Sequence, residues 1–239
     1  METARAVVLC SGGLDSIVCT VLAAFDYREV RAVSVYYGQR HTIELQYAAH
    51  FLDQAGIRQH KVTIDPSIWK QVPLVSPPEF VTKPDPQDDG LEKGRPIYAI
   101  RDGGIPRSFV PGRNLVFLTH AIALADTLGG GDVLYAPNLD DAIGFPDCRP
   151  EAVDAFDKLA QAATSNRVRV RAPLLFFRKR QIAWLAQQMG LDPALTWSCY
   201  SPRTMLDGVI PCGRCDACVL RHDALTNPTP ITDGLPHPS

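Results

Sequence analysis

One short segment of this chain combines the residue types that bind an anion. It is Ser11-Gly12-Gly13-Leu14-Asp15-Ser16, and an apolar run precedes it while a helical pattern follows it. Glycines let the backbone bend sharply and approach a ligand closely, and a helix start presents free N–H groups and the positive end of its dipole. The segment therefore predicts a cradle for an anion, and the expected anion is a phosphate. A plain serine–glycine turn that opens a helix is the alternative.

The segment differs from the common phosphate loop, because it lacks the lysine of G-x-x-x-x-G-K-[ST]. Its S-G-G-x-D-S pattern resembles the PP-loop of ATP pyrophosphatases, which implies cleavage of ATP between the α and β phosphates and transfer of AMP to a substrate oxygen. We expect Asp15 either to cap the helix or to hold Mg²⁺. The residues expected to wrap the ATP are Cys10, Ser11, Gly12, Gly13, Leu14, Asp15, Ser16, Ile17, Val18, Cys19 and Thr20.

A second group with chemical potential consists of four cysteines near the end of the sequence. Cys199, Cys212, Cys215 and Cys218 have the spacing C-x12-C-x2-C-x2-C. Four thiolates at such spacings can close a tetrahedral zinc site, and a site with all four positions filled is structural rather than catalytic. The chain has 7 cysteines, and an odd number argues against a disulfide framework. Unrelated free thiols are the alternative.

The elements that must position these residues alternate between strands and helices. We expect strands at 6–10, 30–37 and 59–64, with helices at 14–25 and 42–56 between them. The first strand lacks polar alternation, which is typical of a central parallel strand buried on both faces. This order predicts an α/β fold with a doubly wound, mostly parallel sheet. In such sheets ligands bind at the carboxyl ends of the strands, where the glycine segment lies.

The remaining elements continue this alternation, apart from one proline-rich stretch. We expect helices at 115–128, 151–164 and 179–190, and strands at 133–136 and 168–171. Nine of the 20 prolines fall between Pro66 and Pro111, and we interpret 76–108 as a long irregular loop. Such a loop is either a lid over the active site or a disordered insertion. The expected domains are 1–190, a zinc-binding helical unit at 191–226 and a flexible tail at 227–239.

Composition narrows the function classes. The net charge is −2, hydrophobic residues make up 46% and charged residues 21% of the 239 residues. These values are typical of a globular protein and do not favour a nucleic-acid or membrane partner. The first residues resemble no signal peptide, and no apolar run is long enough to span a bilayer. We therefore expect a cytoplasmic protein that acts on small molecules.

The ordered set of motifs resembles one family, the QueC-like 7-cyano-7-deazaguanine synthases of queuosine biosynthesis. The resemblance runs from Ala6 to about Leu225. The matching segments are Ser11-Gly12-Gly13-Leu14-Asp15-Ser16, Tyr37-Gly38-Gln39-Arg40-His41 with Glu44, Val110-Pro111-Gly112-Arg113-Asn114 with Phe117-Leu118, Pro146-Asp147-Cys148-Arg149, Pro173-Leu174 with Lys179, Ser198-Cys199-Tyr200, and Cys212-Gly213-Arg214-Cys215-Asp216-Ala217-Cys218 with Leu220-Arg221.

The resemblance implies a fold, a reaction and a set of ligands. The fold is that of the adenine nucleotide alpha hydrolase-like PP-loop proteins. The reaction joins ammonium to 7-carboxy-7-deazaguanine and uses two ATP to form the nitrile 7-cyano-7-deazaguanine. The ligands are ATP, Mg²⁺ and one structural Zn²⁺, and the protein is expected to be a homodimer without a nucleic-acid partner.

The resemblance and the charges of the side chains also suggest site residues. The expected catalytic residues are Ser16, Arg40, His41, Arg113 and Lys179. The three cations offset charge on the phosphates, and His41 is either a proton shuttle or a histidine bonded to backbone. The expected substrate-binding residues are Arg113, Asn114, Asp140, Asp141, Asp147, Cys148 and Arg149. For the three aspartates loop capping is the alternative, and for Cys148 a covalent adduct and a buried structural thiol stay open.

Three other functions fit parts of the pattern. One is a tRNA-modifying PP-loop ligase, which would need a basic surface for RNA. Another is a QueC-like ligase that attaches a deazaguanine to a protein amine, since Phe145 and Ala136-Pro137 depart from the family pattern. The last is a zinc-knuckle interaction module with an inactive loop, which the intact glycine segment disfavours.

Overall fold

A computed structural model of the protein describes residues 5–70, 72, 74–75, 105, 108–205 and 208–231. The expected irregular loop at 76–108 therefore lies almost entirely outside the described residues, as do residues 232–239 of the expected tail. Within the described part of that tail, the backbone N–H of Thr229 donates to the carbonyl oxygen of Arg180 at 3.1 Å. The division into domains stays a prediction.

The centre of the molecule is a parallel five-stranded sheet. Its strands are β1 (Arg5–Leu9), β2 (Glu29–Tyr36), β3 (Arg58–Thr63), β4 (Gly131–Leu134) and β5 (Val168–Arg171). The spatial order is β3-β2-β1-β4-β5, and every neighbouring pair is parallel. The predicted α/β class and doubly wound sheet are confirmed.

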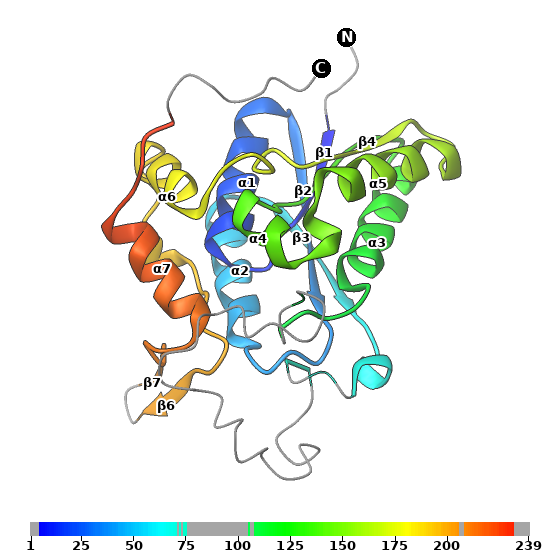
Figure 1. The fold of residues 1–239 in the computed structure, drawn as a ribbon. Coiled ribbons are helices and arrows are strands. Elements are labelled where there is room, and N and C mark those ends of the chain that lie inside the picture. Colours follow the sequence, from blue (N-terminus) through cyan, green and yellow to red (C-terminus); the bar gives the residue numbers. More distant parts are fainter. Residues whose placement is uncertain are drawn as a thin grey trace.

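Helices cover both faces of this sheet (Figure 1). The α-helices are α1 (Leu14–Asp26), α2 (Ile43–Gln54), α3 (Arg113–Thr127), α4 (Leu139–Gly144), α5 (Pro150–Ala163), α6 (Lys179–Gln188) and α7 (Asp216–Thr226). The view shows α1, α2, α6 and α7 on one side of the strands and α3 and α5 on the other. Short 3-10 turns occur at η1 (Pro66–Trp69), η3 (Pro146–Cys148) and η4 (Pro193–Leu195). Among the described residues no helix is long and apolar enough to cross a membrane.

Strand β1 is buried on both faces, as its uninterrupted apolar sequence predicts. Val7 packs into the cluster formed with α3 and α5, while Ala6 and Val8 pack into the cluster formed with α1 and α6. This alternation follows from the two-residue period of a strand. Burial on both faces places the end of β1, and the glycine segment after it, in the middle of the sheet.

The topology reverses direction at β1. The chain adds β2 and β3 on one side of β1 and then returns to place β4 on the other side. The carboxyl ends of β1 and β4 therefore diverge into different loops and leave a crevice between them. This crevice contains the glycine segment and the start of α4.

Two elements differ from the sequence-based expectation. The first is the short helix α4 (Leu139–Gly144), which was not among the expected helices. The side chain of Asn138 caps it by accepting hydrogen bonds from the backbone N–H groups of Asp140 and Asp141 at 3.0 Å each. The second is the antiparallel pair β6 (Arg203–Met205) and β7 (Gly208–Ile210). Its strands have three residues each, too short for a periodicity to stand out.

Candidate active site

A cavity of about 310 Å³ opens at the carboxyl ends of the strands. Side chains from both layers of helices line it, together with those of the segment after β1. The predicted site residues that line it are Cys10, Ser11, Gly13, Leu14, Asp15, Ser16, His41, Arg113, Asn114, Asp141, Cys148 and Lys179. Motifs that lie far apart in the sequence therefore share one site.

The glycine segment has the geometry of an anion cradle. The Ser16 hydroxyl donates to the carbonyl oxygen of Gly13 at 2.9 Å and accepts from the backbone N–H of Ser11 at 3.2 Å. The first intrahelical bond of α1 runs from the N–H of Ile17 to the carbonyl of Gly13. Within the part of the chain that the structure describes, the N–H groups of the first turn before Ile17 have no backbone acceptor, so they can bind a ligand.

Asp15 belongs to a cluster of charged side chains at the start of α1. Its Oδ2 accepts hydrogen bonds from Lys179 Nζ and, at 3.2 Å, from Asn138 Nδ2. Gly13 is the N-cap of α1 and makes no side-chain cap bond, so the expectation that Asp15 caps the helix is wrong. Asp15 Oδ1 is buried without a partner in the described part of the chain. A carboxylate oxygen of this kind suits Mg²⁺, which prefers oxygen ligands.

Lys179 lies between two carboxylates. Its Nζ pairs with Asp15 and lies 3.7 Å from Asp141 Oδ1. Burial alone would lower the pKa of Lys179, but the two carboxylates raise it, so the ammonium stays charged. Burial raises the pKa of Asp141 to about 6, against the opposing effect of Lys179. The predicted cation is thus present at the cavity, with much of its charge offset by protein carboxylates.

Arg113 is the first residue of α3, and it follows Gly112, whose φ of 68° only glycine adopts freely. Its Nη1 donates to Tyr37 Oη at 3.3 Å. Burial would lower the pKa of Arg113, but Tyr37 raises it, and Asp147 adds to this effect. The main partner of this guanidinium is thus a neutral phenol, which leaves its positive charge available to an anionic ligand.

Asp147 and Cys148 lie on η3, close to Asn114. Burial raises the pKa of Asp147, while Arg113 and the backbone N–H of Asn114 act in the opposite direction. Asn114 Nδ2 lies 3.6 Å from Cys148 Sγ. Burial also raises the pKa of Cys148, and a neutral thiol is a poor nucleophile. Of the two roles considered for Cys148, the geometry favours the buried structural thiol.

His41 and Glu44 meet at the start of α2. His41 is 4% exposed, and its Nε2 lies 3.3 Å from Glu44 Oε1. Glu44 Oε1 also accepts from Gln39 Nε2 at 3.3 Å. The alternative in which His41 bonds to backbone finds no support among the described residues, because its Nδ1 is buried without a partner.

Several predicted site residues lie away from the cavity. Arg40 and Arg149 are exposed and do not line it. Asp140 Oδ2 accepts from the backbone N–H of Lys179 at 2.8 Å, so Asp140 caps α6 instead of facing a ligand. Asp147 is buried beside the cavity without lining it. The roles of these four residues in ligand binding therefore stay predictions.

The second half of the predicted ATP-binding run lies inside the core. Ile17, Val18 and Cys19 are fully buried, and all three belong to core clusters. The Thr20 hydroxyl donates to the carbonyl oxygen of Ser16 at 2.7 Å. The first turn of a helix is the part that faces a ligand at its N-terminus, so the place of these four residues in the ATP-binding run stays a prediction. Gly12 acts through packing against α2, described below.

Sequence reasoning missed residues that hold the site together. Asn138 is fully buried, caps α4 and links Asp15 to Asp141 with bonds of 3.2 and 2.6 Å. Its position just before two aspartates was a capping signal. The cavity is also lined by Tyr37, Tyr200 and Glu44. These residues belong to the motifs that carry the family resemblance, but their residue types did not by themselves predict a role in the site.

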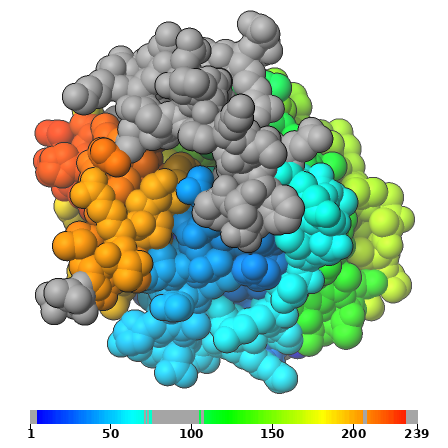
Figure 2. Space-filling view, turned by 90° about the horizontal axis from the view of Figure 1, so that it is seen from below, coloured from blue at the N-terminus to red at the C-terminus, as the bar shows by residue number. Residues whose placement is uncertain are grey.

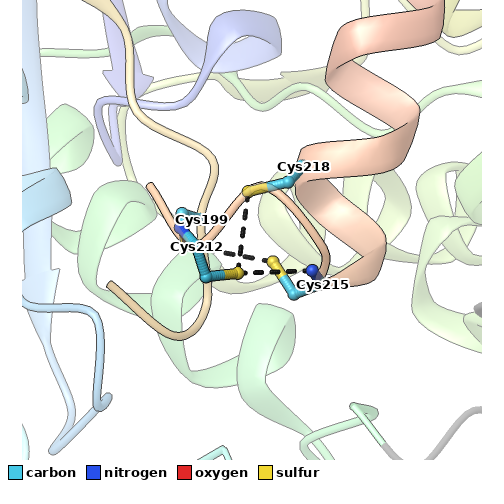
Figure 3. A group of neighbouring side chains, drawn as sticks. All are labelled: Cys199, Cys212, Cys215 and Cys218. Carbon is cyan, nitrogen blue, oxygen red and sulfur yellow. Dashed lines mark hydrogen bonds between the residues drawn. The ribbon is translucent and has the colours of Figure 1, made fainter. Parts of the chain in front are cut away.

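The four predicted metal-ligating cysteines come together in the described structure. Their sulfur atoms all lie within 4.8 Å of one another, and Figure 3 shows them gathered at the start of α7. Cys215 Sγ lies 3.9 Å from Cys199 Sγ, and Cys212 Sγ lies 4.0 Å from Cys218 Sγ. A zinc–sulfur bond of about 2.3 Å in a tetrahedron requires sulfur separations of roughly 3.8 Å. The donor set therefore fits a tetrahedral metal ion.

The fold and the site define the class of this protein: it is a PP-loop α/β protein of the adenine nucleotide alpha hydrolase-like type, with a C-terminal four-cysteine cluster. The model of one family, described as "Queuosine biosynthesis protein QueC", matches residues 5–229. The chain therefore belongs to the QueC family, and it is an enzyme of queuosine biosynthesis.

Curated relatives carry consistent names. The chain is 40% identical to a "7-cyano-7-deazaguanine synthase" of Rhodopirellula baltica, over 92% of this chain and 86% of the relative. A protein of the same name from Syntrophotalea carbinolica is also 40% identical, over 91% and 90%. A solved structure, the "U34-tRNA thiolase NcsA" of Methanococcus maripaludis, has a TM-score of 0.51 at 12% identity over 95% of this chain and 71% of that one. That likeness shows the fold alone.

Proposed function

We propose that this chain converts 7-carboxy-7-deazaguanine and ammonium into 7-cyano-7-deazaguanine with two ATP, through an adenylated acid and an adenylated amide. The observation that carries the proposal is the shared cavity, in which the anion cradle at Ser11 to Ser16 and the Arg113 guanidinium both face the same space. Family membership and the names of the curated relatives support the same reaction.

The chemistry requires two activations at one carbon atom. A carboxylate resists attack by ammonia, because it is already anionic and its oxygen is a poor leaving group. Transfer of AMP to that oxygen makes it a good leaving group, and ammonia then gives the amide. Adenylation of the amide oxygen, followed by loss of AMP, gives the nitrile. Both activations occur at the same atoms, so one phosphate cradle can serve both.

The side chains take roles that follow from their charges and positions. The backbone N–H groups at the start of α1 and the hydroxyls of Ser11 and Ser16 bind the pyrophosphate portion. Arg113 stabilises the charge that develops as the α–β bond breaks, and Lys179 holds Asp15 in place beside it. Asp15 Oδ1 would ligate Mg²⁺, which neutralises phosphate charge when bound.

Two further features belong to the proposal. The four cysteines would hold one structural zinc ion, since all coordination positions are filled by protein. The enzyme would act in the cytoplasm as a homodimer without binding nucleic acid, as the family resemblance implies. Light scattering coupled to size exclusion tests the dimer, and a filter-binding assay with bulk tRNA tests the absence of RNA binding.

A turnover assay tests the function directly. Purified protein is mixed with ATP, Mg²⁺, ammonium and 7-carboxy-7-deazaguanine, and the products are followed by mass spectrometry. We expect nitrile together with two AMP and two pyrophosphate for each acid consumed. Formation of AMP without amide or nitrile would reject ammonium as the acceptor, and the deazaguanine–protein ligase would then become the better function. That alternative is not favoured by the relatives.

A further inference from the structure

Glu44 places a carboxylate beside the phosphate cradle. It lies in the first turn of α2, its side chain is 13% exposed, and it lines the cavity. A Cβ atom on Gly12 would lie 2.1 Å from the carbonyl oxygen of Glu44, so the backbones of the two segments are in contact. Among the described residues Glu44 has no lysine or arginine partner. A carboxylate here repels anionic substrates and favours a small cationic one.

His41 carries a nitrogen atom with no assigned role. Its Nε2 lies 3.3 Å from Glu44 Oε1, so an Nε2–H donates to the carboxylate and leaves the lone pair on Nδ1. Nδ1 is buried and has no partner in the part of the chain that the structure describes. Buried polar atoms without a partner are rare in proteins. This acceptor, in a residue that lines the cavity, therefore indicates a ligand with an N–H or O–H donor.

Gln39 fixes the geometry of this pair. It is 2% exposed, and its Nε2 donates to Glu44 Oε1 and to the carbonyl oxygen of Val35 at 3.3 and 3.2 Å. Its Oε1 accepts from the backbone N–H of Tyr37 at 2.9 Å. A base that is oriented by a carboxylate, which a third group holds in turn, is the arrangement that activates weak nucleophiles in many enzymes.

We propose that His41 Nδ1 is the base that removes a proton from ammonium, and that Glu44 is the positioning residue that sets the histidine tautomer. The proposal rests on the synthase reaction proposed above. Ammonium has no lone pair, so it must lose a proton before it can attack. The ring of Tyr200, whose centroid lies 5.3 Å from that of His41, adds an aromatic face that attracts cations.

Each step balances in atoms and charge. A proton passes from ammonium to Nδ1, and the ammonia nitrogen forms a bond to the acyl carbon of the adenylated acid. The bond from that carbon to the AMP oxygen breaks, and AMP leaves with the electron pair. The attacking nitrogen then loses a second proton, which gives the neutral amide. After the amide oxygen has been adenylated, the nitrogen loses its two protons as AMP leaves and the triple bond forms. His41 accepts such protons in turn and returns them to water.

A change of nucleophile tests this role. Hydroxylamine is unprotonated near neutral pH and attacks an acyl-adenylate without a base, giving a hydroxamate. In His41→Gln we expect the ammonium-dependent rate to fall by about 100-fold or more, while hydroxamate formation and acid-dependent ATP–pyrophosphate exchange stay near the wild-type rates. Glu44→Gln keeps the side-chain volume but reverses the tautomer, so we expect the same split. His50→Gln, at an exposed histidine of α2 outside the cavity, is the matched control and should behave as wild type.

Three outcomes would overturn the proposal. Equal losses with both nucleophiles, or no loss with either, would show that His41 is not a base for ammonium. A raised KM for the acid with an unchanged KM for ammonium would show that the pair contacts the deazaguanine instead. In each of these three outcomes the wild-type enzyme still forms nitrile. If the wild-type enzyme instead forms no nitrile and shows no acid-dependent ATP–pyrophosphate exchange, the proposed function itself is rejected.

Discussion

At the scale of single residues, two half-buried cations that line the cavity have different surroundings. Lys179 is paired with Asp15 and lies near Asp141, so its charge is largely offset before any substrate arrives. Arg113 instead contacts the phenol of Tyr37 and keeps its charge available. Of the two, Arg113 is the side chain suited to stabilise charge that appears only as the reaction proceeds.

Replacement of Arg113 tests this difference. We expect Arg113→Ala to lower kcat by about 100-fold or more, which is typical for removal of one group that stabilises developing charge. Arg28→Ala serves as the matched control, because Arg28 is exposed and outside the cavity, and it should keep near-normal kcat. Steady-state kinetics on both variants gives the comparison, and equal kcat values in the two variants would contradict the assignment of Arg113.

Asp141 gives the protein a specific pH dependence of stability. Burial raises its pKa from 3.8 to about 6, so its contribution is fully present below pH 4 and is lost as pH rises through 6. Relative to Asp141→Asn, the free energy of unfolding of the wild type should fall by about 1 to 2 kcal/mol across this range. A shift of two pKa units would correspond to roughly 2.7 kcal/mol, and partial exposure of the Asp141 side chain reduces that figure. Urea titrations of both proteins between pH 4 and 6 measure the steep part of the change. Parallel curves would contradict the raised pKa.

At the scale of elements, the two glycines of the cradle, Gly12 and Gly13, differ in how closely other segments pack against them. A Cβ atom on Gly12 would lie 2.1 Å from the Glu44 carbonyl oxygen and 2.8 Å from the Ala48 backbone nitrogen, and its φ is +95°. A Cβ atom on Gly13 would meet nothing closer than 3.4 Å, and its φ is −73°. Gly12 is therefore the residue that lets α2 pack against the loop after β1.

The two glycines make a matched pair for mutation. Gly12→Ala should destabilise the protein by about 2 kcal/mol or more, because backbone atoms must move and the φ is strained. Gly13→Ala should stay within about 1 kcal/mol of wild type, since an unstrained alanine adds little cost. Chemical denaturation distinguishes them, and equal losses from the two variants would show that the packing of α2 on Gly12 is not what requires glycine.

At the scale of the whole molecule, the C-terminal unit is part of the site. Figure 2 shows its orange segment beside the blue residues of the α2 region, where the rings of Tyr47 and Trp197 lie 5.2 Å apart. The backbone N–H of Trp197 donates to the carbonyl oxygen of Gly12 at 2.8 Å, and Arg221 lines the cavity. Ala224 joins the core cluster of α1 and α6. A metal ion at the cysteines would thus help to hold Trp197 in place, and Trp197 in turn contacts the phosphate cradle at Gly12.

Loss of one cysteine ligand should therefore also weaken ATP binding at the active site. We expect Cys215→Ser to lose about one zinc ion per chain, to lower the melting temperature, and to weaken ATP binding as well, since structural zinc contributes roughly 10 kcal/mol to its unit. Cys148→Ser, outside the cluster, should keep its zinc. Metal analysis with calorimetric ATP titration measures both effects. A zinc-free Cys215→Ser protein that melts and binds ATP like wild type would refute the structural role.

The sequence alone determined the features that depend on local pattern. The order of the five sheet strands and of the longer helices, the parallel sheet, the anion cradle and the gathering of four cysteines all follow from runs of apolar residues, from glycine next to a helix start and from fixed ligand spacings. These signals act within a few residues or repeat along one element, so they remain visible without any knowledge of packing.

Only the tertiary structure decided which side chains share the cavity. Asp140 and Asp141 are neighbours in the sequence, yet one caps α6 and the other faces the site. Arg40 and His41 are equally close in the sequence, yet only His41 enters the cavity. The direction of each side chain depends on how the short segments after the strands pack against α2, α4 and α6. Such contacts between distant parts of the chain leave no periodic signal in the sequence. Residue types could therefore suggest candidate site residues, but they could not predict which of them line the cavity.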